Sequence, residues 1–308
     1  MQKKKRDFKS NNKKFDKSKK PQKPLSKYTT RVFVPSSTFP TKVAREAKDI
    51  EIKALASIET EANNRRDFRK VLTFTIDPVD AKDYDDAISF QPLDGGYFEV
   101  GVHIADLSFY VKPGSALDEE AAKRATSIYF VDKVIPMLPE ELSNDICSLK
   151  EDIDRLTYSA IFEINEQGEI RKEWFGRTVI HSDKRFSYDD VQATIETGKG
   201  LYNKEIKLLN KIALALRKKK EAAGAIAFND DEIKFELDET GWPVRVYRKE
   251  LKDANKLIED FMLLANRKVA EFVSKINKNR DKTFIYRVHD TPDMEKVGAL
   301  ADFLRPLG

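Results

Sequence analysis

The amino-acid sequence predicts an α+β protein whose sheet is mainly antiparallel and is packed by helices. Three pairs of strand-like segments flank short turns that contain glycine, which is typical of β-hairpins. Three of the four long segments with helical spacing of apolar residues come after the first two hairpins instead of alternating with single strands. This order favours α+β over a parallel α/β architecture.

The strand segments begin at Val71. Residues 71–77 are rich in β-branched and aromatic side chains and predict a buried strand. The three predicted hairpins turn at 94–96, 165–169 and 239–241. Neighbouring strands should therefore pair through short local connections.

Helices are predicted at 41–65, near 188–197, at 205–223 and at 251–276. Ser187 followed by Asp190 is a variant of the capping box and predicts where the second helix begins. Gly224 is a typical residue at a helix end. The last helix should face the core with one apolar stripe, formed by Leu257, Phe261, Leu264, Val269 and Phe272.

The charge is distributed unevenly along the 308 residues. The net charge is +4, but residues 1–27 alone carry a net charge of +10, so the remainder carries −6. Such a lysine-rich tail is typical of disordered chain. It either binds phosphate backbones without regard to sequence or serves only as a solubilising extension. Residues 28–65 are expected to be a linker and helical lead-in, and 66–308 the main domain.

Composition argues against several classes of protein. The sequence has no run of 18 apolar residues and no apolar segment of a secretory signal at its N-terminus, so we expect neither a membrane span nor a signal peptide. The lone Cys147 excludes an internal disulfide and is expected to be a buried thiol. These features predict a cytoplasmic protein.

Five aspartates fall within ten residues directly after the first predicted strand, at 77, 80, 83, 85 and 86. Such crowded negative charges repel one another and call for a counter-charge. Three interpretations compete: a solvated acidic loop, a calcium loop, and a magnesium site for phosphoryl transfer. An EF-hand requires Gly at its sixth position and Glu at its twelfth. A loop starting at Asp77 has Lys82 and Ile88 there, and one starting at Asp80 has Asp85 and Gln91.

The stretch TIDPVDAKDYDDAISF resembles the signature of the ribonuclease II and ribonuclease R (RNB) family of exoribonucleases. VGVHIADLSFYV (100–111) and SIYFVDKVIPMLPEELSNDICSL (127–149) resemble two further family blocks in the same order. LIEDFMLLAN (257–266) and YRVHDTPD (286–293) resemble later segments, so the resemblance runs from about Pro40 to Gly308. The segment 173–188 is more similar to ribonuclease R than to ribonuclease II.

The resemblance implies an RNB-type catalytic domain with Mg²⁺ as its cofactor. By motif position, four aspartates correspond to the family's catalytic and metal-binding quartet: Asp77, Asp83, Asp85 and Asp86. Asp80 lies outside this quartet and is expected to be a turn residue. Tyr129 corresponds to the tyrosine that stacks on the 3′-terminal nucleotide, and Phe228 and Glu259 to a pair that holds the terminal nucleotides. His103, His181 and His289 are expected to be structural.

The implied activity is processive 3′→5′ hydrolysis of single-stranded RNA to nucleoside 5′-monophosphates, in RNA degradation and turnover. Single-stranded RNA is the expected partner, with other RNA-decay factors; the sequence leaves the oligomeric state open. Family members usually carry cold-shock domains before this domain, an S1 domain after it, and an arginine-bearing segment at its end. We expect this chain to lack all three, so the domain is expected to be incomplete at its C-terminus. A non-catalytic or weakly active RNA-binding remnant therefore stays open as the alternative.

Overall fold

The structure is a computed structural model that describes residues 35–225, 232–276, 283–288 and 290–307. The chain divides into two compact units, 1–36 and 37–308, and every element below belongs to the second. The predicted basic tail lies outside the described residues, as do Phe228 and His289. In the part of the chain that is described, no helix combines the length and apolarity needed to cross a bilayer.

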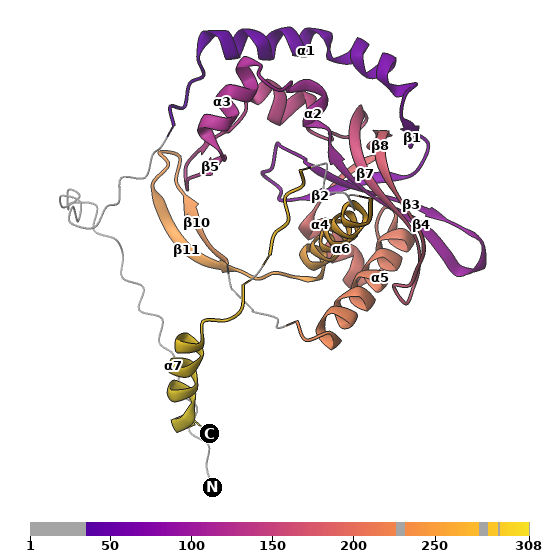
Figure 1. The fold of residues 1–308 in the computed structure, drawn as a ribbon, viewed down its shortest axis with the longest axis vertical. Coiled ribbons are helices and arrows are strands. Elements are labelled where there is room, and N and C mark those ends of the chain that lie inside the picture. Colours follow the sequence, from indigo (N-terminus) through magenta and orange to yellow (C-terminus); the bar gives the residue numbers. More distant parts are fainter. Residues whose placement is uncertain (1–34, 226–231, 277–282, 289, 308) are drawn as a thin grey trace, which may run out of the picture. The chain divides into compact units, whose positions relative to one another are not determined.

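A seven-stranded sheet is the main framework of the larger unit (Figure 1). Its strand order is β1-β8-β7-β4-β3-β2-β9. The strands are β1 (Arg66–Asp67), β2 (Thr73–Asp77), β3 (Asp86–Pro92), β4 (Tyr97–Ala105), β7 (Asp154–Asn165), β8 (Ile170–His181) and β9 (Lys184–Ser187). Two small hairpins stand apart from it: β5 (Ile128–Tyr129) with β6 (Val134–Ile135), and β10 (Glu232–Leu237) with β11 (Pro243–Lys249).

The mainly antiparallel sheet and all three predicted hairpins are confirmed. β3 pairs with β4, β7 with β8, and β10 with β11, each antiparallel across a short turn. The sequence did not predict the edges of the sheet, where β1 pairs with β8 and β9 pairs with β2 in parallel. These pairings join segments about one hundred residues apart, which no local pattern specifies.

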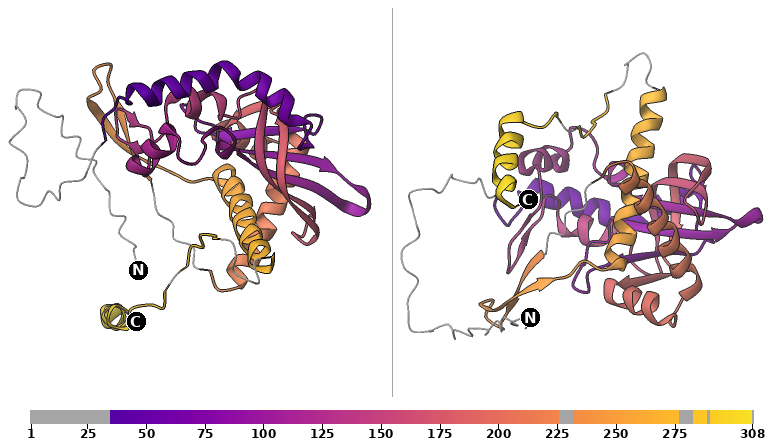
Figure 2. Two further views of the ribbon diagram at one scale, coloured as in Figure 1. Left: turned by 45° about the horizontal axis from the view of Figure 1, so that its top comes forward. Right: turned by 90° about the horizontal axis from the view of Figure 1, so that it is seen from below.

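Helices cover both faces of the sheet (Figure 2). The helices that pack on it are α1 (Thr41–Ala62), α2 (Leu107–Tyr110), α3 (Ala116–Arg124), α4 (Tyr188–Thr197), α5 (Asn203–Ala222) and α6 (Asp253–Ile276). A further helix, α7 (Met294–Leu304), has no buried residues. The predicted helices are present, with ends shifted by up to three residues. The first ends at Ala62 instead of residue 65, because the chain extends into β1 at Arg66.

Two apolar layers hold the fold together, one on each face of the sheet. The alternation of side chains along a strand supplies both layers: Ala87 and Ile161 contribute to one, and Ile88 and Phe162 to the other. The first layer also contains α1, α3 and the buried Cys147. The second contains the buried faces of α4, α5 and α6. Both ends of the aspartate-rich loop are therefore fixed in a rigid two-sided core.

The start of α4 is fixed directly after β9. The Ser187 hydroxyl accepts a hydrogen bond from the Asp190 amide at 3.1 Å, and the Asp190 carboxylate accepts one from the Ser187 amide at 3.0 Å. This reciprocal capping box confirms the predicted helix start. Because Ser187 also lies opposite Asp77 in the sheet, the box holds Tyr188 next to the end of β2.

His103 is a structural residue of β4, as predicted. Its side chain is completely buried, and its two ring nitrogens lie 2.6 Å from the Ser159 hydroxyl and 2.8 Å from the Ser89 hydroxyl. Burial lowers the pKa of His103 to about 3, so the ring is neutral in the folded chain at neutral pH. The two hydrogen bonds give both ring nitrogens of the neutral imidazole a partner, and they also give each buried hydroxyl one.

We expect His103 to make the fold sensitive to acid. The unfolded chain takes up a proton on this ring near pH 6.5, whereas the folded chain does so only near pH 3. Its contribution to stability is therefore complete above about pH 6.5 and falls as the pH drops towards 3, by at most ~1.4 kcal/mol per pH unit. The free energy of unfolding is measured by urea titration of the parent and of His103→Gln between pH 8 and 4.5. The parent should be more stable by an amount that decreases below about pH 6.5. An advantage that stays constant over this range would contradict the expectation.

Candidate active site

The aspartate-rich loop connects two neighbouring strands of the sheet. Asp77 is the last residue of β2, and Asp86 is the first residue of β3, which pairs antiparallel with β2. Strand pairing therefore returns the chain to the same edge, and Asp83 and Asp85 lie in the connection between these ends. Asp77 is buried at 8% exposure, whereas Asp85 is exposed.

Burial and mutual repulsion raise the pKa values of three carboxylates in this loop. Burial raises the pKa of Asp77 to about 7, and the carboxylates of Asp86 and Asp85 act in the same direction. Burial and Asp85 raise the pKa of Asp86 to about 6. Asp85 is exposed to solvent, but partial desolvation of its carboxylate and the negative charge of Asp83 still raise its pKa. Such coupled, raised carboxylate pKa values are typical of functional sites.

Two tyrosines flank the aspartates. Tyr129, in the short strand β5, is 67% exposed, and its hydroxyl donates a hydrogen bond to Asp83 Oδ2 at 3.3 Å. Tyr188, at the start of α4, has its pKa raised to about 12 by burial and by the charges of Asp86 and Asp77. The structure thus brings Tyr129 next to the quartet across 46 residues of sequence.

A cleft of about 880 Å³ opens beside the loop. It lies between the 78–80 end of the loop, the segment 129–134, the start of α4 and one side of the β10–β11 hairpin. Both tyrosines line it, and the cationic side chains along it include Lys133, Lys249 and Lys252. Asp80, Asp132, Asp189 and Glu250 also line it, so the cleft combines aromatic rings with charges of both signs. Single-stranded nucleic acid binds to proteins by stacking its bases on such aromatic rings.

Of the other two predicted RNA contacts, Glu259 falls within the described residues, and it does not line this cleft. Glu259 lies on α6, where its carboxylate is 3.9 Å from Lys220 of α5. The neighbouring Asp260 is buried and pairs with Arg217 at 2.9 Å. Phe228 falls outside the described residues. In the described part of the chain, the site therefore consists of the quartet with Tyr129 and Tyr188.

The carboxylates fit a hard divalent cation. Asp77 Oδ2 is buried without a hydrogen-bond partner. A bound cation would give this oxygen a partner and would reduce the repulsion among the carboxylates. In the described ranges, no three acidic, imidazole or thiol side chains converge closely enough to enclose one ion. Mg²⁺ does not require such a cage, because it usually keeps several waters and takes one or two carboxylates together with substrate phosphates.

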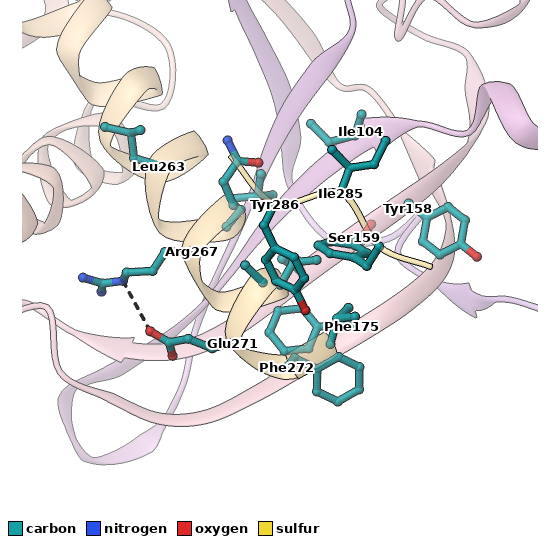
Figure 3. Close-up of a pocket in the computed structure, with 18 of the residues that line it drawn as sticks. Ile104, Tyr158, Ser159, Phe175, Leu263, Arg267, Glu271, Phe272, Ile285 and Tyr286 are labelled. Atoms are coloured by element: carbon teal, nitrogen blue, oxygen red, sulfur yellow. Dashed lines mark ion pairs between the residues drawn. The ribbon is translucent and has the colours of Figure 1, made fainter. Parts of the chain in front are cut away.

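A second cavity, of about 1130 Å³, lies elsewhere, between the sheet, α6 and residues 284–287 (Figure 3). Its lining is mostly apolar, with Ile104 and Phe175 from the strands and Phe272 from α6. The charged pair within it, Arg267 and Glu271, is 3.8 Å apart and belongs to one helix. This cavity contains no cluster of carboxylates and therefore offers no comparable chemistry.

The sequence-family model named RNB domain matches residues 65–307 of this chain. The chain belongs to the RNB family. Ribonuclease R of Thermotoga maritima is 43% identical over 276 residues, which are 88% of this chain and 38% of that protein. DIS3-like exonuclease 2 of Schizosaccharomyces pombe is 44% identical over 263 residues, which are 80% of this chain and 28% of that protein. The chain thus spans well under half the length of these relatives.

Solved structures of RNB proteins have the same fold. Mycoplasma genitalium RNase R in complex with double-stranded RNA superimposes with a TM-score of 0.72 at 27% identity, over 87% of this chain and 51% of that one. The same protein in complex with ribose-methylated single-stranded RNA gives a TM-score of 0.71. The family and the fold class inferred from the sequence motifs are therefore confirmed.

Sequence reasoning overlooked Tyr188 and Arg185. Both lie at the end of the segment 173–188, which was recognised as similar to ribonuclease R but was given no role. The parallel pairing of β9 with β2 is what brings this segment to Asp77. A basic residue three positions before a helix start offers no local signal of that proximity.

Proposed function

We propose that this chain is the hydrolytic domain of a Mg²⁺-dependent 3′→5′ exoribonuclease that releases nucleoside 5′-monophosphates from single-stranded RNA. The observation that carries the proposal is the hydrogen bond between Tyr129 and Asp83. It places an exposed aromatic ring at the edge of a cluster of carboxylates that repel one another. The family membership and the similarity to ribonucleases R support RNA as the substrate.

Asp77, Asp83, Asp85 and Asp86 would hold Mg²⁺. When bound, Mg²⁺ supplies charge neutralisation at the phosphoryl group and lowers the pKa of a water molecule. Tyr129 stacks on the terminal base, which tolerates any base because every base has a π-face. Lys133, Lys249 and Lys252 attract the phosphate backbone into the cleft. Contacts to 2′-hydroxyls would distinguish RNA from DNA. A cytoplasmic location stays a prediction from the sequence.

One RNA labelled separately at each end tests the proposal. With Mg²⁺, a 3′ label should appear at once as labelled mononucleotide, whereas a 5′ label should stay on steadily shortening products. EDTA should stop both reactions. If the RNA binds but no mononucleotide appears at any Mg²⁺ concentration, the chain is the RNA-binding module that the sequence left open as the alternative.

We expect Tyr129→Ala to alter the final products more than the initial rate on long RNA. Loss of the ring removes stacking worth ~1–3 kcal/mol per base, and short products depend most on that contact. High-resolution gels of the final products should show longer end products for Tyr129→Ala. Tyr129→Phe keeps the ring and loses only the hydroxyl that donates to Asp83, so it is the matched control and should retain the parent's end products. Unaltered end products for Tyr129→Ala would exclude stacking by this residue.

A further inference from the structure

Arg185 lies next to the aspartate loop, although it is more than one hundred residues away in the sequence. It is in β9, in register with Thr75 of β2, two residues before Asp77. Its Nη2 donates hydrogen bonds to the carbonyl oxygens of Pro78 at 2.5 Å and Val79 at 3.0 Å. These two carbonyls follow directly after the end of β2, where the ladder of the sheet no longer provides partners for the backbone.

The same guanidinium also contacts the far end of the loop. Its central carbon lies 5.5 Å from the centre of the Tyr84 ring, and Tyr84 directly precedes Asp85. The Tyr84 hydroxyl donates to the carbonyl of Ala81 at 3.0 Å, which fixes the ring against the middle of the loop. One side chain therefore connects the beginning and the end of the segment 78–84.

The loop is held from a second direction by the segment that contains Ser148. The Ser148 hydroxyl accepts from the Tyr84 amide and donates to the Lys82 carbonyl, both at 3.0 Å. The Leu149 amide donates to the Tyr84 carbonyl at 2.8 Å. These contacts fix only the part of the loop near Tyr84. The part at Pro78 and Val79 is held by Arg185 and by the Ala81 amide, which donates to the Pro78 carbonyl at 3.1 Å.

We propose that Arg185 is a positioning residue that holds the loop 78–84, so that Asp83 and Asp85 keep a fixed placement relative to Asp77 and Asp86. The proposal rests on the proposed nuclease function. Arginine suits this role because its planar group donates several hydrogen bonds in fixed directions and also lies on aromatic rings. A lysine at this position would keep the charge but could not make the same set of contacts.

Hydrogen exchange and kinetics on the whole chain test the proposal together. Arg185→Gln and Arg185→Lys are compared with Arg171→Gln. Arg171 is the matched control, because it is also a strand arginine that lies over a tyrosine ring, at 4.2 Å from Tyr97, and binds a surface group, Glu163. Amide exchange of peptides covering 78–85 is measured without Mg²⁺. Cleavage is measured at saturating RNA, and RNA affinity is measured in EDTA.

We expect Arg185→Gln to speed exchange in 78–84 and to slow cleavage by up to about 100-fold, since small misplacements of reacting groups cost that much. Its RNA affinity should stay within about twofold, because the residue acts on the loop and not on RNA. Arg185→Lys should lie between Arg185→Gln and the parent, and Arg171→Gln should match the parent.

Three results would overturn the proposal. They are unchanged exchange in 78–84 for Arg185→Gln, equally faster exchange throughout the sheet, and an equal loss of rate in Arg171→Gln. If Arg185→Gln does not fold, the same comparison is made with Arg185→Lys. A parent chain without nuclease activity would refute the proposed function, and the exchange data would still decide whether Arg185 holds the loop.

Discussion

Replacing Asp85 by asparagine should abolish RNA hydrolysis while leaving the fold intact. The change is nearly isosteric and removes one negative charge from a carboxylate that is accessible to substrate within the quartet. Loss of a single group that stabilises the transition state electrostatically typically lowers the rate by ~10²–10³-fold. The measurement is release of mononucleotides from 3′-labelled RNA in Mg²⁺, together with RNA affinity, which should change little.

The stability of this variant provides a second, independent measurement. Removing one of several mutually repelling charges should leave the free energy of unfolding in Mg²⁺-free buffer equal to that of the parent, or raise it. Asp80→Asn is the matched control, because Asp80 lies in the same loop but outside the quartet. It should hydrolyse RNA at nearly the parent's rate. If Asp85→Asn cleaves like the parent, the assignment of the quartet is wrong.

The largest expected effect on stability is at Asp106. This residue follows β4 in the His-Ile-Ala-Asp block, and its carboxylate lies 2.8 Å from Arg65, with both side chains fully buried. The carboxylate also accepts from the Ser108 hydroxyl at 2.6 Å and from the Phe109 amide at 3.2 Å, which caps α2. Asp106→Ala should cost about 3–5 kcal/mol, because the buried Arg65 charge loses its fully buried partner and keeps the partly exposed Glu61, at 3.2 Å.

Urea unfolding of Asp106→Ala measures this cost, and Glu163→Ala is the control. Glu163 pairs with Arg171 at 2.7 Å at the protein surface, where such a pair is worth at most ~1 kcal/mol. The double variant Arg65→Met/Asp106→Leu should recover much of the loss, because it removes both buried charges together. Equal costs for Asp106→Ala and Glu163→Ala would show that Glu61 or water is sufficient to compensate the Arg65 charge.

The local elements of this protein can be predicted from its amino-acid sequence. The hairpin turns, the capping box at Ser187 and the apolar stripe of α6 are each specified by residues close together in the chain, so pattern and chemistry were sufficient to predict them. The aspartates at 77 and 86 also come together locally, since antiparallel pairing of two successive strands returns the chain to its starting edge. Motif resemblance supplied the family for the same reason, because its blocks are contiguous.

Which distant segments surround those aspartates depends, by contrast, on tertiary packing. The parallel pairing of β9 with β2 brings Arg185 and Tyr188 to the loop, and the β5 segment places Tyr129 at Asp83. Packing of α6 on α5 places Glu259 next to Lys220 and outside the cleft. Such contacts depend on how two helical layers pack on a shared sheet, and that packing is a sum over many residues that no single segment of sequence encodes.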